Sequence, residues 1–335
     1  MKKADLSLAA PLALLAALGR QGPRALSAIV AIGILVPPFG AAFKPFLTAA
    51  VFGLLCISFV RLDTRAFLGY LRKPGLVLLA TVWSTLLVPL LFGVLCLAFG
   101  IRQRWPELYL GLTLQGIAPP MMSAPAIAAL LGLDATLVLA SMIASTALIP
   151  ITAPLLAYLL IGPDMALAPL AIGVKLLAVL TGSAAVGLGL RCVVPSGSVE
   201  RHADAIGGLN ILILFVIVAA LMETVAAQLT AAPLTLVAYA VLAFAVFAAL
   251  LYGTTLLFIR AGHPRAMAIG LMVAQRNLGL MISATGNALP SLTWLYFAVC
   301  QFPIYLSPKL LQTVIRRHPA FPAPDAASAR SDAQA

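Results

Sequence analysis

Long apolar stretches separated by short polar connections dominate the chain between residues 25 and 315. A helix that crosses a bilayer needs about 20 mainly apolar residues, and every backbone polar group in lipid must be paired within the protein. Ten stretches meet this requirement, at residues 25–43, 46–62, 74–100, 106–132, 135–161, 165–191, 205–227, 232–259, 265–290 and 292–315. The sequence therefore predicts an all-α integral membrane protein with ten transmembrane helices.

The composition leaves no room for a soluble domain of useful size. Hydrophobic residues make up 62% of the chain and charged residues 9%, whereas about 25% of a soluble domain is charged. These values exclude a receptor with a folded sensor, a pump with a soluble ATPase domain and most enzymes that act on soluble substrates. HExxH, Walker A and GxGxxG motifs are also absent from the sequence. We expect no enzyme activity, no metal site of its own and no organic cofactor.

The net charge of +11 follows the predicted topology, because the basic residues are scattered through the short connections and form no nucleic-acid-binding run. Lys and Arg accumulate in the cytoplasmic connections of membrane proteins. With a cytoplasmic N-terminus, three of the 21 basic residues lie outside, namely Lys44, Arg102 and Arg104. Sixteen lie inside: Lys2, Lys3, Arg20, Arg24, Arg61, Arg65, Arg72, Lys73, Arg191, Arg201, Arg260, Arg265, Lys309, Arg316, Arg317 and Arg330. We therefore expect both termini to be cytoplasmic, a location in the plasma membrane (the inner membrane of a bacterium), and no nucleic-acid partner.

The two ends of the chain differ from the predicted spans. Lys2 and Lys3 precede a short apolar run, which is typical either of an amphipathic helix at the membrane interface or of a cleaved signal peptide. We expect residues 1–22 to form an interfacial segment. Residues 318–335 are rich in Ala, Pro, Ser and Asp, and they are predicted to form a disordered tail.

Two of the predicted spans are interrupted by residues that do not suit a membrane helix. The fourth span contains Pro119, Pro120 and Pro125, and proline frees backbone carbonyls that lipid cannot satisfy. The ninth span contains the polar sequence Gln275-Arg276-Asn277 at a depth where each polar side chain is expensive. We therefore expect both helices to be broken.

The two breaks fall in corresponding places, in the fourth span of the first five and the fourth span of the last five. Because five is odd, residues 25–161 and 165–315 are predicted to form two repeats of opposite orientation in the membrane. Paired broken helices in inverted repeats are typical of the substrate site of a secondary transporter, where helix ends and free carbonyls offer partial charges. We expect the two helices to cross at their breaks.

These segments resemble the bile acid:sodium symporter family over nearly the whole chain, from Ile32 to Arg316. The family sequence Pro-Gly-Gly-Thr-x-Ser-Asn of helix four corresponds to Pro119-Pro-Met-Met-Ser-Ala-Pro125. The Ser- and Thr-rich helix five corresponds to Leu139-Ala-Ser-Met-Ile-Ala-Ser-Thr-Ala-Leu-Ile-Pro150, and Glu-x-Gly-x-Gln-Asn-x-Gly-Leu of helix nine to Met272-Val-Ala-Gln-Arg-Asn-Leu-Gly-Leu280. Helix ten is similar around Phe297-Ala-Val-Cys-Gln301. The resemblance implies ten helices in a core and a panel domain, with uptake of organic anions together with sodium.

The sequence departs from the family at the positions that the resemblance assigns to sodium. The acidic ligand of helix nine is replaced by Met272, the adjoining Gln by Arg276, and the Ser-Asn pair of helix four by Ala124 and Pro125. Two hydroxyl positions of helix five are occupied by Val138 and Met142, although a slip of one residue would bring Ser141 into place. A thioether and a guanidinium are poor substitutes for the hard oxygen ligands that sodium prefers. We expect either that the sodium sites are lost or that Arg276 replaces the ion as a fixed cation, and coupling to Na⁺ or H⁺ is left open.

Intramembrane charges are candidates for substrate contact, and each has a structural alternative. Arg276 either captures a carboxylate, sulfonate or phosphate of the substrate or satisfies the free carbonyls of the fourth span. Lys175 either lines the cavity or pairs with Glu223. Gln115 and Gln275 flank the breaks, where they either orient a ligand or bind carbonyl groups.

Several further polar residues and methionines lie near the breaks. Asn210 is expected to form a hydrogen bond between helices. Met121, Met122 and Ser123 connect the two halves of the fourth span and suit an adaptable apolar wall, or else ordinary packing. The predicted substrate contacts are Arg276, Asn277, Gln275, Gln115, Pro119, Met122, Ser123, Lys175 and Gln301.

A secondary transporter that moves a small amphipathic organic anion by alternating access accounts for these features best. A membrane-embedded binding or accessory protein with the same fold but no transport is the main alternative, and an integral-membrane enzyme acting on lipid is a third. The expected partners are an organic anion and the lipid bilayer. The sequence leaves the substrate, the direction of transport and the oligomeric state open.

Overall fold

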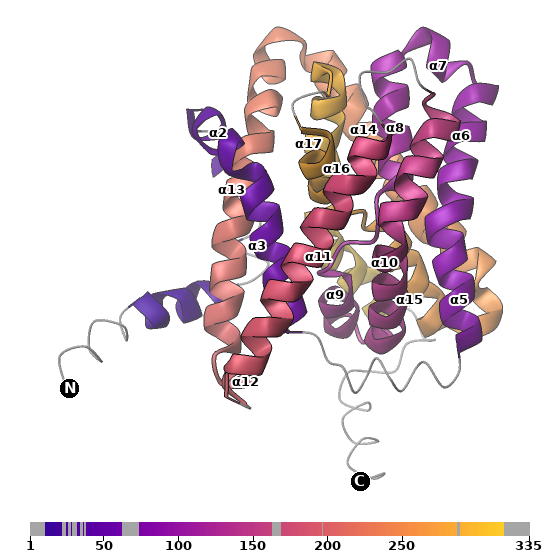
Figure 1. Ribbon diagram of the computed structural model, residues 1–335. Coiled ribbons are helices and arrows are strands. Elements are labelled where there is room, and N and C mark those ends of the chain that lie inside the picture. The colour runs from indigo at the N-terminus through magenta and orange to yellow at the C-terminus, as the bar shows by residue number, and fades with distance from the viewer. Residues whose placement is uncertain are drawn as a thin grey trace.

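The computed structural model describes residues 11–21, 38–61, 74–162, 169–195, 197–286 and 289–317, together with residues 25, 28, 32, 33 and 36. These residues form helices and no strand (Figure 1). The helices are α2 (Pro38–Phe43), η1 (Lys44–Phe46), α3 (Leu47–Val60), α5 (Pro74–Val82), η2 (Trp83–Leu87), α6 (Val88–Ala98), α7 (Ile101–Arg104), α8 (Pro106–Ile117), α9 (Ala124–Leu130), α10 (Ala135–Leu160), α11 (Pro169–Val193), α12 (Ser198–Arg201), α13 (Ala203–Ala231), α14 (Pro233–Leu257), η3 (Ile259–Ala261), α15 (His263–Ala274), α16 (Leu278–Thr285) and α17 (Ser291–Arg317).

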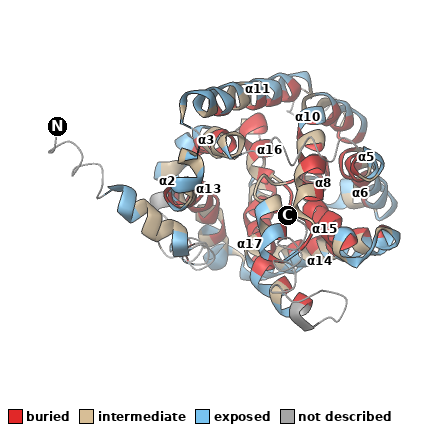
Figure 2. Ribbon diagram, turned by 90° about the horizontal axis from the view of Figure 1, so that it is seen from below, coloured by how far each residue is buried: buried red, intermediate tan, exposed pale blue. Residues whose placement is uncertain are grey.

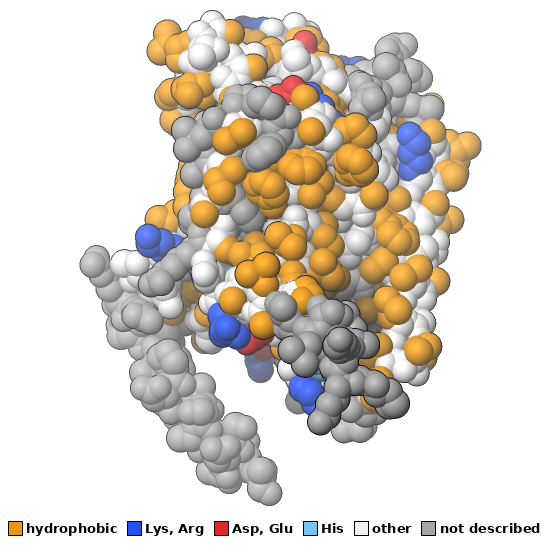
Figure 3. All heavy atoms as spheres, turned by 90° about the vertical axis from the view of Figure 1, so that its left-hand side faces the viewer, with side chains coloured by type: hydrophobic (Ala, Val, Ile, Leu, Met, Phe, Trp, Pro, Cys, Tyr) orange, Lys and Arg blue, Asp and Glu red, His pale blue; other side chains and the backbone are white. Residues whose placement is uncertain are grey.

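The prediction of an all-α membrane protein is confirmed. Among the described residues, six helical stretches are long and apolar enough to cross a bilayer: Gly40–Val60, Pro74–Ala98, Ala135–Leu160, Pro169–Val193, Ala203–Ala231 and Pro233–Leu257. Their outer faces carry exposed leucines, and one side of the molecule is covered by apolar side chains (Figure 3). Such a surface is unfavourable in water and suits lipid.

From the second predicted span onward, the predicted boundaries agree with the helix ends to within a few residues, but two details differ; most of the first predicted span lies outside the described residues. The connection from the first to the second predicted span is a 3₁₀ turn, η1, which ends at Phe46 before α3 begins. The predicted third span is not a regular α-helix, because a π-helical turn, η2, separates α5 from α6. This turn bears directly on the candidate site.

Helices α2, α3, α11 and α13 pack on one another along one side of the molecule, and we call them the panel (Figures 1 and 2). The other long helices form the main bundle, in which α14 packs on α15 and α17, and α10 packs on α5 and α9. The panel meets the main bundle where α13 contacts α17 and where α3 and α11 contact α16. Buried residues gather on the inward faces of both groups (Figure 2).

The bundle has two ends, which we name after the short helices α7 and α12 that lie at opposite ends in Figure 1. Arg102 and Arg104 lie in α7, and Arg201 lies in α12. Ion pairs occur at both ends, between Lys44 and Glu223 (2.9 Å) near the α7 end and between Arg265 and Asp134 (3.5 Å) near the α12 end. Polar groups therefore cap a bundle whose middle is apolar.

Residues 11–21 of the predicted interfacial segment are helical and lie beside the start of α13. Arg20 lies 3.6 Å from Asp204, and Gly19 approaches the Asp204 backbone so closely that no side chain fits between them. Its position at the membrane interface stays a prediction. Residues 1–10, and the predicted disordered tail at 318–335, lie outside the described residues.

The contact between α14 and α15 depends on a glycine. A Cβ atom on Gly270 would lie 2.4 Å from the Leu251 carbonyl oxygen and 2.4 Å from Thr255 Oγ1, whereas one on Gly253 would meet nothing within 4 Å. We predict that Gly270→Ala lowers the free energy of unfolding by about 1–3 kcal/mol, the usual effect of overpacking. Gly253→Ala is the control, and it should leave stability unchanged or slightly raised because alanine favours helix. Thermal unfolding in detergent measures both, and equal shifts would contradict this account of the packing.

Candidate functional site

The two broken segments meet through their backbones in the middle of the molecule. The amide of Met121 donates to the carbonyl of Gln275 (2.8 Å), and the amide of Asn277 donates to the carbonyl of Pro119 (2.8 Å). Pro120 and Arg276 form the antiparallel bridge between these bonds. Each break therefore satisfies polar groups that the other releases, as a membrane interior requires.

The local sequence explains why each helix stops and restarts here. Pro119 and Pro120 lack amide hydrogens, so α8 ends at Ile117. In the second segment α15 ends at Ala274, and the Asn277 side chain caps α16 by accepting a hydrogen bond from the Leu280 amide (3.0 Å). Asn at such a position is a favoured helix start.

Arg276 lies at the centre of this crossing and is 1% exposed. Its Nη1 atom donates to the carbonyl oxygen of Ala118 (2.8 Å), and it also contacts the carbonyl oxygen (3.1 Å) and the hydroxyl (3.3 Å) of Ser84. Ala118 follows the end of α8, so its carbonyl has no partner within that helix. The alternative that Arg276 satisfies free carbonyls of the fourth span is therefore partly correct.

Ser84 is a contact that the sequence did not predict, and the π-turn η2 explains it. In an α-helix the Ser84 carbonyl would accept from the amide of Val88, but that amide donates to Trp83 instead. The next residue, Pro89, has no amide hydrogen to offer. The Ser84 carbonyl is consequently free to bind Arg276. The sequence carried one signal of this contact, namely Pro89 within a predicted span, because a proline leaves an earlier carbonyl of its helix without a donor. The π-turn found there is of a kind that is frequent at functional sites.

The remaining donors of Arg276 are unused. Its Nε and Nη2 atoms are buried and have no hydrogen-bond partner among the described residues. Nε–H and the adjacent Nη2–H form the side of the guanidinium that binds two oxygens of one carboxylate, sulfonate or phosphate. One edge of Arg276 is thus anchored to carbonyls, while the other carries two buried donors that no described residue uses.

Arg276 lines a cavity of about 450 Å³ between the panel and the main bundle. Asn277, Gln301, Asn210 and Ser123 contribute polar groups to its wall. Most of the remaining lining is apolar and comes from α3, α10, α13 and the connection between α8 and α9, including Leu54, Leu55, Met121, Met122, Met142, Ile143, Leu214 and Ile217. A small polar centre in an apolar cavity suits an amphipathic ligand.

The cavity extends toward the α12 end only. Its wall includes Ser58, Phe59 and Arg61 at the end of α3, and Ala135 and Thr136 at the start of α10. Arg61 is exposed at this mouth. The cavity is therefore open toward the α12 end.

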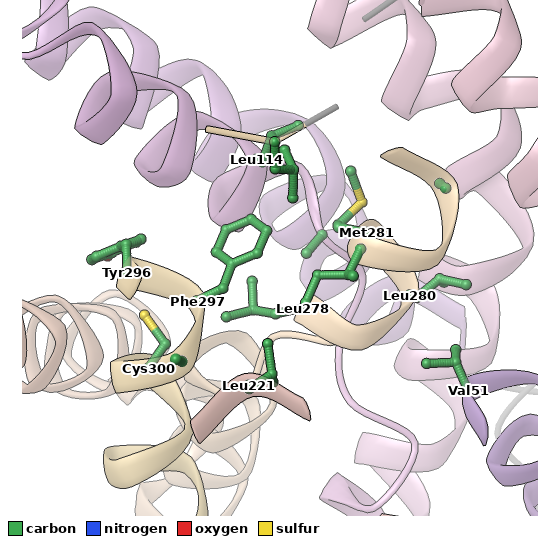
Figure 4. Close-up of a cluster of buried hydrophobic side chains, with 14 of the residues drawn as sticks. Val51, Leu114, Leu221, Leu278, Leu280, Met281, Tyr296, Phe297 and Cys300 are labelled. Atoms are coloured by element: carbon green, nitrogen blue, oxygen red, sulfur yellow. The ribbon is translucent and has the colours of Figure 1, made fainter. Parts of the chain in front are cut away.

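On the α7 side the cavity ends at an apolar plug of Leu221, Leu278 and Phe297, of which only Leu278 still lines the wall. The lining of α13 stops at Ile217, one turn before Leu221, and the lining of α17 begins at Gln301, one turn after Phe297. All three plug side chains are buried, and they gather between α13, α16 and α17 (Figure 4). The plug separates the cavity from the α7 end.

The structure brings five of the nine predicted substrate contacts to the cavity and leaves four elsewhere. Those at the cavity are Arg276, Asn277, Met122, Ser123 and Gln301. Gln115 is buried outside the lining, where its Oε1 accepts a hydrogen bond from Tyr296, and the Gln275 side chain donates to Ser307 Oγ (3.0 Å). Pro119 contributes its carbonyl to the crossing and does not line the cavity. The Gln115 and Gln275 side chains therefore tie the two broken segments to α17, and Pro119 is part of the crossing itself.

Lys175 corrects the sequence prediction. It lies on the exposed face of α11 and is not part of the cavity wall. Its expected pairing with Glu223 is wrong, because that carboxylate lies 2.9 Å from Lys44. The prediction inferred the depth of Lys175 in the membrane from its residue number, and residue number does not tell which way a side chain faces. In the structure the face of α11 that carries Lys175 points outward.

The positions that the family resemblance assigns to sodium do not form an oxygen site. Met272 and Ala124 are fully buried outside the cavity wall, whereas Met142 and Pro125 line it. The described residues contain no cluster of His, Cys, Asp and Glu that could hold a metal ion. On α10, the hydroxyls of Ser141, Ser145 and Thr146 are buried without hydrogen-bond partners among the described residues.

Comparison with known proteins adds no assignment. No family model matches the chain, and no curated protein matches it in sequence.

Proposed function

We propose that the protein is a secondary transporter that moves a small amphipathic organic anion by alternating access. The observation that carries this proposal is the half-used guanidinium of Arg276, which is buried, lines the cavity and keeps Nε and Nη2 without partners. A permanently charged group at this depth is costly, so an anionic ligand that completes its hydrogen bonds explains its presence better than packing does. The leucines and methionines of the wall suit the apolar part of such a ligand.

Ten membrane-spanning segments in two inverted repeats belong to the same proposal. The broken pairs α8/α9 and α15/α16 supply the fourth and ninth segments, and each pair contains helices too short to cross a bilayer alone. Their meeting at the middle of the chain's apolar bundle supports a transporter site. The resemblance to bile acid:sodium symporters is part of this proposal.

We place the α12 end on the cytoplasmic side of the plasma membrane. Arg61, Arg191, Arg201, Arg260 and Arg265 lie in or beside the connections assigned to that side, against Lys44, Arg102 and Arg104 at the other. In this orientation the cavity faces the cytoplasm and the plug of Leu221, Leu278 and Phe297 closes the outer side. A cavity closed on one side is what alternating access requires of each of its end states.

Sodium binding at the crossing is disfavoured by Arg276. Its Nη1 atom already donates hydrogen bonds to the Ala118 and Ser84 carbonyl oxygens, and the guanidinium would repel a sodium ion placed beside them. The hydroxyls of Ser141, Ser145 and Thr146 are the oxygens that a coupling ion could still use. We propose transport that does not need a sodium gradient.

The proposal is tested with the purified full chain and one matched series of probes. Naphthalene-2-sulfonate, 2-naphthoate and 2-naphthyl phosphate differ only in the anion, and the neutral naphthalene-2-sulfonamide is the control. We expect the anions to bind with measurable affinity and the sulfonamide to bind at least about tenfold more weakly. We also expect each labelled anion to enter proteoliposomes that are preloaded with the same unlabelled anion and have potassium on both sides. Uptake that requires an inward sodium gradient would contradict sodium independence. Binding without uptake would favour a non-transporting binding protein, and absence of binding by every anion would contradict the proposal.

A further inference from the structure

Arg276 has no acidic partner within the described part of the chain. The carboxylates described there are bound elsewhere or exposed: Glu107 accepts from the Leu292 amide, Asp134 and Asp204 pair with Arg265 and Arg20, Glu223 pairs with Lys44, and Glu200 lies in α12. The contacts of the guanidinium are the neutral oxygens of Ala118 and Ser84. Its charge is consequently balanced only by what enters the cavity.

This unbalanced charge restricts how the carrier can change its opening, if the proposed alternating access holds. While the cavity is open to the α12 end, water that fills it lies beside Arg276 and lowers the energy of its charge, although the Nε and Nη2 atoms are themselves covered. Switching to the α7 end requires the cavity to close around Arg276, and a lone cation then loses its water without gaining a partner. A bound anion forms a pair with the guanidinium, so the loaded site closes as a neutral unit.

We infer that the protein is an obligate anion exchanger, in which the site crosses only when it holds an anion. Each anion delivered must then be replaced by another before the site returns, and the flux is one anion for one anion. The inference rests on the proposed transport function and specifies its mode. Arg276 is the controlling group because it is charged at every physiological pH.

Two positions on α13 can report which way the cavity is open. Leu214 lines the cavity, and Leu221 lies two turns further along the same helix, buried in the plug. A cysteine at position 221 should react with a membrane-impermeant maleimide from the α7 side only when the plug opens. A cysteine at position 214 should react from the α12 side in the present state and lose that reactivity when the site turns over.

The experiment measures maleimide labelling of Leu221→Cys and Leu214→Cys in oriented vesicles, with polyglutamate, a polyanion too large for the cavity of about 450 Å³, as the only added anion. The four native cysteines, Cys56, Cys96, Cys192 and Cys300, are replaced by alanine. Arg276→Gln removes the charge, and Ser84→Asp neutralises it by placing a carboxylate where Ser84 Oγ lies 3.3 Å from Nη1. Arg276→Lys keeps the charge and is the matched control.

We expect Arg276→Gln and Ser84→Asp to label at position 221 at least about tenfold faster than the unsubstituted chain and Arg276→Lys, because the uncharged site closes without a desolvation penalty. Addition of naphthalene-2-sulfonate should bring the unsubstituted chain to the faster rate. Because the two neutralising variants act at different residues, a folding failure of either leaves the other as the test.

Two results would overturn the inference in distinguishable ways. If the unsubstituted chain labels at position 221 as fast as both neutral variants without a probe anion, exchange is not obligatory and alternating access stands. If position 221 stays unreactive in every variant and with every probe, the plug does not open, and the proposed transport function is lost as well.

Discussion

Replacing Arg276 by Gln is expected to lower the affinity for naphthalene-2-sulfonate by at least about 30-fold, since truncating one partner of a buried charged pair costs about 2–5 kcal/mol. The Nε and Nη2 donors, which have no partner among the described residues, are lost, and no other described basic side chain lies at the crossing. Arg276→Lys keeps the charge but not the two parallel donors, so an intermediate loss of about tenfold is expected. Fluorescence titration of the purified protein measures all three affinities.

The control for this prediction is Lys175→Gln, which removes the other basic residue that the sequence places deep within a predicted span. Because Lys175 is exposed on α11 and does not line the cavity, its replacement should leave the affinity unchanged. Equal affinities for Arg276→Gln and the unsubstituted chain would show that the guanidinium serves only the Ala118 and Ser84 carbonyls. A thermal unfolding scan of each variant separates loss of binding from loss of the fold.

Pro89→Ala is expected to lower the affinity for the same probe by about 10- to 100-fold, although Pro89 does not line the cavity. An alanine amide at position 89 provides the Ser84 carbonyl with a donor inside its own helix, in competition with Nη1 of Arg276. A hydrogen bond to a charged group contributes about 1.5–3 kcal/mol, and its loss frees the guanidinium to leave its anchored position. Titration with naphthalene-2-sulfonate measures the effect.

Ser84→Ala is the matched comparison for Pro89→Ala. It removes the hydroxyl at 3.3 Å from Nη1 but keeps the carbonyl at 3.1 Å, so the affinity should fall by less than about threefold. An effect of Ser84→Ala larger than that of Pro89→Ala would mean that the hydroxyl, and not the π-turn, positions Arg276.

Much of the fold and the centre of the site could be predicted from sequence because the signals are local. An apolar stretch of sufficient length is a property of consecutive residues, and so is the proline pair at Pro119 and Pro120. Arg276 was identified for the same reason, as a charge within an apolar segment. These features hold whatever the neighbouring helices are.

The residues that were missed or misplaced depend on neighbours far away in sequence. Ser84 contacts Arg276 across 192 residues, and its carbonyl is free only because η2 replaces one turn of α-helix. Lys175 was expected inside because it is deep in a span, but the packing of α11 on α3 turns it outward. Gln115 was expected at the ligand, and Tyr296 of α17 takes its oxygen instead.

The sequence by itself determined that the chain is helical, that it suits a membrane, and that two segments break, one of them at the only arginine deep within a predicted span. The tertiary structure decided what that arginine does. Packing places the Ala118 and Ser84 oxygens at Nη1 of Arg276, leaves its Nε and Nη2 atoms without partners among the described residues, and puts the residue in the wall of a cavity that extends toward the α12 end. The reason is physical: apolar character and helix breaks are set by neighbours along the chain, whereas hydrogen-bond partners and open faces are set by which helices come together.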